Sequence, residues 1–427
     1  MIKAQPFGKV LRYGAASVGP IGSAGAQFLL SLVLLHALSQ REFGAFSFLL
    51  VASQFSWGLW SALFCAPLPI LFHGNSGLER DRLMRSLFSS NLVVAVLALP
   101  IFYAMAASLD VPVRGTLLFA LYASIALIRW FARAYSYVSG TPYRTMASDL
   151  AYSGALLAGI ALFFIAGGRS LDIAYGALLA SALVGLLPFG APYLKQQFGQ
   201  FSARAVPDYF AIWKRHSGWS LLGVLTTEAT ANSHAYIVTA LFGPRAFAPI
   251  AASALLVRPI NVAMNALTEF ERAQMAREVG GGRVDVAMRA VRFFRMVMAV
   301  AWLGTVSAVG VLLWFSPHAI FPARYPLGFL ATGGALWMLV AGVRLMRAPE
   351  STLLQSAGEF RNLALASVIS SVFSVVAVLA LLLTFGVLWS IAGILIGETI
   401  YCLWIHRECR RWLHRNSEGH LAMAGAA

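Results

Sequence analysis

Residues 362–397, NLALASVISSVFSVVAVLALLLTFGVLWSIAGILIG, contain no charged side chain. A helix needs about 20 apolar residues to cross the ~30 Å hydrocarbon core of a bilayer. One helix over the whole stretch would overrun that thickness, and the only visible break lies near Thr384–Gly386. The stretch therefore predicts two membrane-spanning helices, Leu363–Phe385 and Leu388–His406.

Similar apolar runs recur along the whole chain, which is 59% hydrophobic and 11% charged. Soluble globular domains carry about 25% charged residues. The pattern predicts an all-α polytopic membrane protein of about twelve transmembrane helices. The other predicted spans are Ala15–Leu38, Phe43–Phe72, Ser86–Ala107, Gly115–Tyr137, Ala147–Gly167, Asp172–Pro192, Ser217–Phe242, Phe247–Phe270, Phe293–Phe315 and Gly328–Leu345.

The longest polar stretch between two spans, residues 193–216, predicts a cytoplasmic linker. It separates an N-terminal bundle of six helices, residues 1–192, from a C-terminal bundle of six, residues 217–406. Residues 407–427 form a predicted basic cytoplasmic tail. Because six is even, both bundles begin on the same side of the membrane, as in transporters built from parallel repeats.

The net charge of +15 is explained by topology rather than by a nucleic-acid partner. With the N-terminus inside, 24 of the 32 Lys and Arg residues fall at cytoplasmic ends, 5 at the opposite ends and 3 within helices. Such a bias orients membrane proteins with their basic loops in the cytoplasm. We therefore expect both termini in the cytoplasm and no nucleic-acid binding.

Sequence signals of catalysis and of cofactors are missing. Cys65, Cys402 and Cys409 are too scattered for a metal site or a disulfide framework, and no Walker, zinc-ligand or Gly-x-Ser-x-Gly pattern occurs. The first apolar run is too long for a cleavable signal peptide and is expected to stay as helix one. We expect no cofactor, no metal, no catalytic residue and no enzymatic activity.

Four short segments resemble those of bacterial polysaccharide flippases. Residues 35–46 (LHALSQREFGAF) are similar to the family's first hairpin, although Ser39 and Gln40 replace its usual Gly-Pro. Residues 241–249 (LFGPRAFAP) keep that pair in the second half of the chain. Residues 129–135 (RWFARAY) and 256–261 (LVRPIN) look like the family's fourth and eighth helices.

This family is the polysaccharide transporter branch of the multidrug/oligosaccharidyl-lipid/polysaccharide exporter superfamily. The resemblance implies two six-helix lobes around a central cavity and alternating access. It also implies flipping of an undecaprenyl-diphosphate-linked oligosaccharide across the bacterial inner membrane for O-antigen, capsule or exopolysaccharide synthesis. Glycosyltransferases and a polymerase of the same pathway are the implied partners, together with membrane lipid.

Ionisable residues at membrane depth are functional candidates because burying them in lipid is costly. Glu228 and Arg258 are expected at equal depth on neighbouring helices, where they form either a substrate and coupling site or a structural ion pair. Arg129 and Arg133 share one helix face and suit a diphosphate, with snorkelling as the alternative for Arg133.

Further candidates come from other polar residues within the spans. Asn232, His234 and the stretch from Thr226 to Thr230 predict either a wet cavity wall or interhelical hydrogen bonds. Glu398, beside Gly393 and Gly397, is expected to pair with a neighbouring helix. The predicted substrate-binding set is thus Arg129, Arg133, Arg258, His234 and Asn232, and the predicted coupling or gating set is Glu228 and Glu398.

Three other functions remain open at this stage. A membrane glycan polymerase or ligase would need a sizeable outward loop bearing Arg and His, which the short predicted loops lack. A cation-coupled drug exporter of the same superfamily is the second alternative, although arginines within helices favour an anionic cargo. A scaffolding protein without transport is the third, and the charges within the membrane weigh against it.

Overall fold

The computed structural model describes residues 6–74, 76–167, 170–316, 318 and 321–424. Within these ranges every regular element is a helix, as predicted. In this described part of the chain, eleven segments are long and apolar enough to cross a membrane. One of them, Ser220–Met264, is broken at Gly243, where φ is 77° and ψ is 171°. That segment therefore holds two helices, and the total agrees with the prediction of about twelve.

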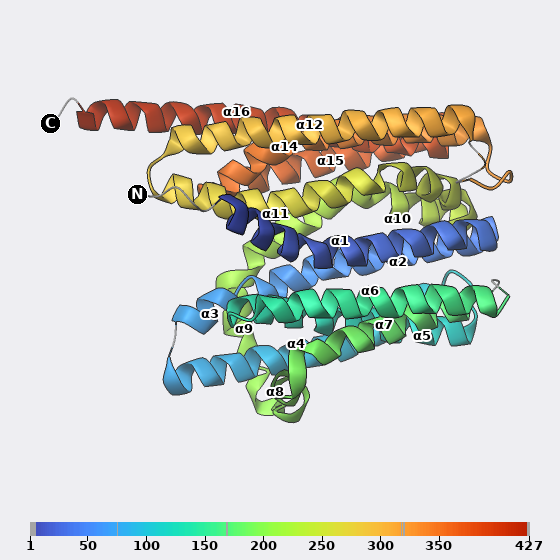
Figure 1. Cartoon of the computed structure of the whole chain (residues 1–427), viewed down its shortest axis with the longest axis horizontal. Helices are drawn as coiled ribbons and strands as arrows, with labels where there is room; N and C mark the ends of the chain where they lie inside the picture. Colours follow the sequence, from blue (N-terminus) through green and yellow to red (C-terminus); the bar gives the residue numbers. More distant parts are fainter. Residues whose placement is uncertain (1–5, 75, 168–169, 317, 319–320, 425–427) are drawn as a thin grey trace. The chain divides into compact units, whose positions relative to one another are not determined.

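The chain forms two compact units. Unit 1 consists of Met1–Leu225 and Phe242–Ala251, and unit 2 of Thr226–Leu241 and Ala252–Ala427. In each unit the long helices run side by side (Figure 1). The predicted domain boundaries at residues 192 and 217 stay a prediction.

Unit 1 contains six helical crossings. Its helices are α1 (Pro6–Ala37), α2 (Gln40–Trp60) with the π-helical turn η1 (Ser61–Cys65) and α3 (Leu68–Gly74), α4 (Gly77–Ala107), α5 (Val113–Val138), α6 (Pro142–Ile165) and α7 (Leu171–Leu186). A capping box at Ser39 and Glu42 starts α2 immediately after α1, since each side chain accepts a hydrogen bond from the other residue's backbone. The predicted first hairpin therefore has a defined turn without Gly-Pro.

The predicted linker is folded onto unit 1. Residues 187–217, which include this linker at 193–216, contain η2 (Leu187–Phe189), α8 (Gly190–Leu194), η3 (Lys195–Gly199), η4 (Ala203–Ala205), α9 (Tyr209–Ile212) and η5 (Trp213–Ser217). The Tyr209 hydroxyl donates to the Leu63 carbonyl at 2.7 Å, and the Tyr209 ring stacks on Phe64. Arg82 pairs with Asp208 at 2.9 Å. These contacts tie the segment to α4 and η1.

Unit 2 contains the other crossings. Its elements are α10 (Gly218–Ala254), which it shares with unit 1, η6 (Leu255–Val257), α11 (Arg258–Gly280), α12 (Val284–Phe315), α14 (Leu327–Ser356), α15 (Phe360–Phe385), η7 (Val387–Trp389) and α16 (Ser390–Ala424). Gly386, with φ 93°, ends α15 and confirms the predicted break. A Cβ on Gly393 would lie 2.4 Å from the Val378 backbone nitrogen, and one on Gly397 would lie 2.4 Å from the Ser374 Cβ. Gly393 and Gly397 therefore permit a close approach of α16 to α15.

Several helices are longer than predicted, mostly at the ends expected in the cytoplasm. α4 starts at Gly77 instead of Ser86, α12 starts at Val284 instead of Phe293, and α16 runs to Ala424 instead of His406. An apolar run in the sequence marks only the part of a helix that lies inside the hydrocarbon core of the membrane. Arg, Glu and Lys are good helix formers, so each helix continues past that limit.

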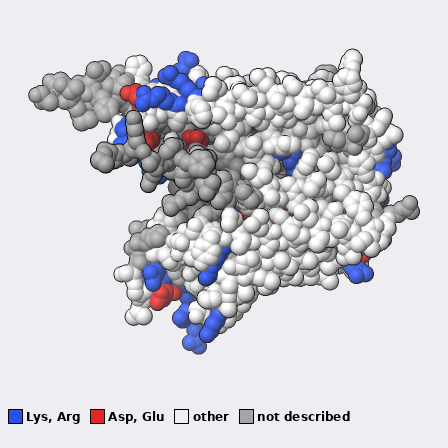
Figure 2. All heavy atoms as spheres, in the orientation of Figure 1, with Lys and Arg blue, Asp and Glu red and all other residues white. Residues whose placement is uncertain are grey.

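The outer surface of each unit suits lipid. α12 leaves large apolar side chains exposed, with Val300 at 67% and Trp314 at 83%. In Figure 2, Lys and Arg lie mostly near helix ends, and wide uncharged areas separate them. Exposing this much apolar surface would be unfavourable in water but not in a bilayer. The chain is a multi-pass membrane protein.

Candidate functional site

Arg129 and Arg133 share one carboxylate in unit 1. They lie four residues apart on one face of α5, as predicted. Asp149, on the adjacent α6, accepts from Arg129 Nη2 at 2.5 Å and pairs with Arg133 Nη2 at 3.0 Å. The Asp149 side chain is fully buried, and those of the two arginines are 10% and 16% exposed. We call this group the α5–α6 triad.

Contacts on every side hold Arg129 in the α5–α6 triad. Its Nε donates to Ser148 Oγ at 3.0 Å, and its guanidinium lies 4.5 Å from the centre of the Tyr152 ring. A Cβ on Gly185 of α7 would come within 2.6 Å of Arg129 Nε. The glycine therefore makes room for the guanidinium, and the cation–π contact adds to its stabilisation.

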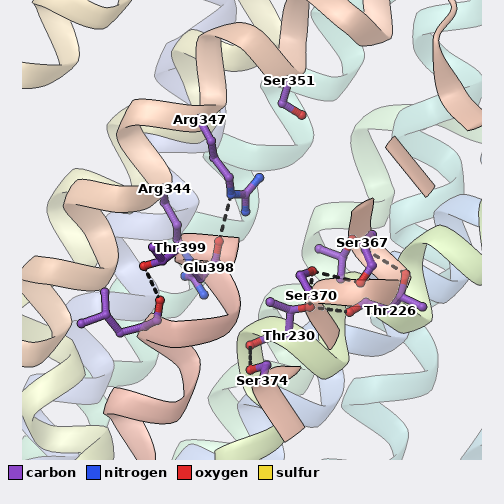
Figure 3. A network of polar contacts seen from close by, with 12 residues as sticks. Thr226, Thr230, Arg344, Arg347, Ser351, Ser367, Ser370, Ser374, Glu398 and Thr399 are labelled. Atoms are coloured by element: carbon purple, nitrogen blue, oxygen red, sulfur yellow. Dashed lines mark hydrogen bonds and ion pairs between the residues drawn. The ribbon is translucent and has the colours of Figure 1, made fainter. Parts of the chain in front are cut away.

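Unit 2 contains a second group of two arginines and one carboxylate. Arg344 and Arg347 lie three residues apart on α14, and their Nε atoms donate to the two oxygens of Glu398 on α16 at 2.7 and 2.9 Å. Glu398 is 1% exposed and each arginine side chain 17%. Figure 3 shows both arginines reaching toward Glu398. We call this group the α14–α16 triad.

The two arginines of the α14–α16 triad have different surroundings. The Arg347 guanidinium lies 4.5 Å from the centre of the Tyr401 ring. Arg344 Nη2 is buried and has no hydrogen-bond partner among the described residues. Arg344 is also within electrostatic range of Glu228 and His234 on α10. It therefore connects the triad to the polar part of α10.

Glu228 is held by neutral donors on its own helix. Asn232 Nδ2 and the Tyr236 hydroxyl each donate to one of its oxygens at 2.9 Å, from positions one and two turns further along α10. Within the described residues it takes part in no ion pair under 4 Å, whereas Asp149, Glu350 and Glu398 all do. Glu228 is therefore an interior carboxylate that no described guanidinium binds closely.

A row of hydroxyl groups joins α10 to α15. Thr226 Oγ1 lies 2.8 Å from Ser367 Oγ, Thr230 Oγ1 lies 3.2 Å from Ser370 Oγ, and the Ser374 hydroxyl donates to the Thr230 carbonyl at 2.9 Å. Figure 3 shows this row along the two helices. The interhelical hydrogen bonds predicted for the span Ser217–Phe242 are thus present at Thr226 and Thr230, whereas Asn232 bonds to Glu228 within α10.

His234 and Arg258 complete the predicted set. His234 is 3% exposed, and its ring packs edge-on against Trp337 of α14 at 5.3 Å between ring centres. Arg258 is half-buried at the first residue of α11. The hydrogen bonds described for Glu228 come from Asn232 and Tyr236, so its predicted pairing with Arg258 stays a prediction, as do the roles assigned to these residues.

The sequence prediction did not identify Asp149, Arg344 or Arg347 as site residues. The predicted span Gly328–Leu345 places Arg344 and Arg347 at a cytoplasmic helix end. In the structure α14 continues to Ser356, so both arginines lie within the helix. An available signal was the Arg-x-x-Arg spacing, which resembles Arg129-x-x-x-Arg133 in the fourth helix of the first half. Among the described residues, no three His, Cys, Asp or Glu side chains are grouped to hold a metal ion.

No protein-family model and no curated protein matches this sequence. Solved structures do match over nearly the whole chain. An outward-facing multidrug resistance MATE family transporter of the MOP superfamily aligns with a TM-score of 0.64 at 14% identity, covering 95% of this chain and 96% of that one. A point mutant of the Vibrio cholerae MATE transporter VcmN aligns with a TM-score of 0.65 at 14% identity, covering 94% and 95%.

A eukaryotic MATE transporter, AtDTX14, aligns with a TM-score of 0.63 at 14% identity, covering 96% of this chain and 98% of its own. The matches include both an inward-facing and an outward-facing conformation. At these identities the likeness concerns the fold and not the cargo. This chain has the fold of the MATE transporters of the MOP superfamily.

Proposed function

We propose that this protein is a secondary transporter that works by alternating access and exports an amphipathic solute, with a cation or proton at Glu228 as the driving ion. The fold supports this proposal, because solved structures with it are transporters in inward-facing and outward-facing states. We further propose a bacterial inner membrane as its location.

One observation carries the choice of Glu228. Asp149 and Glu398 each form ion pairs with two guanidinium groups, so neither can bind a driving ion without giving up those pairs. An amide and a phenol hold Glu228 instead. Such a carboxylate exchanges a proton or a cation at lower cost, and Arg344 lies near enough to respond to that change.

The test uses full-length protein in proteoliposomes with an imposed pH or Na⁺ gradient and a fluorescent organic cation as the solute. We expect Glu228→Gln to lower gradient-driven transport at least about tenfold, since the charge that couples the two movements is gone. Glu79→Gln, the same change at an exposed position of α4, should transport normally. Full gradient-driven transport by Glu228→Gln would refute this coupling site.

A second cargo, a lipid-linked oligosaccharide, is favoured by the arginine pairs. Each triad combines two arginines with one carboxylate and therefore carries a net charge of +1, which suits a diphosphate. In that case glycosyltransferases and a polymerase would be its pathway partners. Cells lacking the protein would then hold lipid-linked oligosaccharide on the inner leaflet. Normal delivery of the lipid-linked oligosaccharide to the outer leaflet in such cells would exclude this cargo and leave export of an amphipathic solute as the proposed function.

A further inference from the structure

A basic hollow lies where α15 begins and α16 leaves the span, at the end of unit 2 that the charge bias places in the cytoplasm. It has a volume of about 520 Å³ and is lined by Asn362, Glu408, Arg410, Arg411, His414 and Arg415. Three arginines and one glutamate give this lining a net charge of +2. Neither triad contributes to it, so it is separate from the candidate transport site.

Two glutamates hold the lining in place. Glu359 accepts from Arg415 Nη2 at 2.9 Å and from Asn362 Nδ2 at 2.7 Å. Glu408 accepts from Arg411 Nη1 at 2.7 Å. Arg410 is exposed and makes no ion pair with any described residue. The hollow therefore combines positioned donors with one arginine whose charge is not compensated, an arrangement suited to phosphate.

The hollow borders the apolar side of α15. Leu365 and Val372, three and ten residues after Asn362 on the same face of the helix, are 48% and 58% exposed. A phosphate bound beside Asn362 would thus have an exposed apolar track leading from it along the span. Amphipathic lipids match that combination, whereas a free phosphate would leave the apolar track unused.

We propose that this hollow binds the headgroup of an anionic phospholipid, with the acyl chains lying along α15. Arg410, Arg411 and Arg415 hold the phosphate, and Asn362 donates to the headgroup. The site lies at the level where cytoplasmic-leaflet headgroups meet the protein. The bound lipid links α15 to α16 at this end of unit 2, whatever the transporter's cargo.

The experiment is native mass spectrometry of the purified full-length chain, titrated with phosphatidylglycerol or with phosphatidylcholine. We expect the wild type to retain phosphatidylglycerol selectively and the double variant Arg410→Gln/Arg415→Gln to bind it about thirtyfold more weakly, at about 1 kcal/mol for each basic residue. Arg407→Gln is the matched control, because Arg407 is exposed on the same helix but does not line the hollow. Its affinity should stay within about twofold of the wild type.

Three outcomes would overturn the proposal. Equal binding of the two lipids would show that the headgroup charge is not recognised. An equal loss in Arg407→Gln would show general basicity instead of a site. Displacement of the lipid by millimolar glycerol phosphate would show that the hollow prefers a free anion. Thermal unfolding of each variant identifies any loss of binding that arises from misfolding.

Discussion

The α5–α6 and α14–α16 triads each combine two arginines with one carboxylate but differ in what surrounds their arginines. Arg129 has Asp149, Ser148 and the Tyr152 ring around it. Arg344 donates to Glu398, yet its Nη2 is buried without a hydrogen-bond partner in the described part of the chain. Arg133 Nε and Asp149 Oδ2 of the first triad also lack such a partner, so the difference lies in the neighbours: Arg344 is within electrostatic range of Glu228, the proposed coupling residue. We therefore assign a structural role to the first triad and a mechanistic one to the second.

The largest effect is expected from Asp149→Asn, which leaves two buried arginines without their carboxylate. Removing one partner of a buried ion pair costs about 3–5 kcal/mol. Chemical or thermal unfolding of the purified protein in detergent measures this loss. Asp110→Asn is the control, since Asp110 pairs with Arg41 at the surface, with side chains 72% and 60% exposed, and such pairs contribute about 0–1 kcal/mol. Equal losses in the two variants would contradict the structural role.

A smaller loss is expected from Gly185→Ala, because the new Cβ would meet Arg129 Nε at 2.6 Å and Tyr152 Cβ at 3.3 Å. Overpacking of this kind costs about 1–3 kcal/mol. The same substitution at Gly176, also on α7, meets no atom within 4 Å. It should raise the free energy of unfolding by about 0.5–1 kcal/mol, since alanine favours helical geometry more than glycine does. If the two alanine variants unfold alike, the packing around Arg129 is looser than the structure indicates.

Arg344→Gln and Arg347→Gln separate mechanism from stability within one triad. We expect Arg344→Gln to slow gradient-driven transport about tenfold, equal to about 1.4 kcal/mol in the barrier, because it removes a cation within electrostatic range of Glu228. Arg347, bound to Glu398 and the Tyr401 ring, should matter more for unfolding than for transport. Transport in proteoliposomes and unfolding in detergent are measured on both variants. If Arg347→Gln lost more transport and Arg344→Gln lost more stability, Arg347 would have the mechanistic role and Arg344 the structural one.

The membrane made the fold largely predictable from the sequence. Hydrocarbon thickness limits each crossing to a narrow length, so apolar runs give the number of helices and Gly386 marks the turn within the longest run. Helix ends were predicted less well, because the charges of Arg344 and Arg347 end the apolar run near Leu345 while α14 continues to Ser356. Water does not stop a helix whose residues favour helical geometry.

Individual residues of the sites were predictable from the sequence, but most of the contacts between them were not. Arg129, Glu228 and Glu398 stand out because a charge within an apolar run is rare. The residues that pair with them do not stand out. Glu398, for example, is 51 and 54 residues from Arg347 and Arg344, and no local spacing in the sequence indicates that contact. The partners of Glu228 are local instead. Its two described hydrogen-bond donors lie one and two helical turns away on the same helix, where a helical wheel predicts them.

The smallest effect is expected in the row of hydroxyls between α10 and α15. Thr230 is 3% exposed and Ser370 fully buried, and their hydroxyls lie 3.2 Å apart. Interhelical hydrogen bonds in membrane proteins average about 0.6 kcal/mol, because each group also finds partners in the unfolded state within the lipid. Each hydroxyl here has such a partner in its own helix, the Thr226 and Ser367 carbonyls.

A double-mutant cycle of Thr230→Val and Ser370→Ala should therefore give a coupling free energy of about 0.6 kcal/mol in unfolding experiments. Such a small value means that α10 can slide or rotate against α15 without a large penalty. A mobile α10 is what a transporter needs if Glu228 is to face two sides of the membrane in turn. A coupling above about 2 kcal/mol would instead fix α10 to α15 and move the predicted rearrangement to another pair of helices.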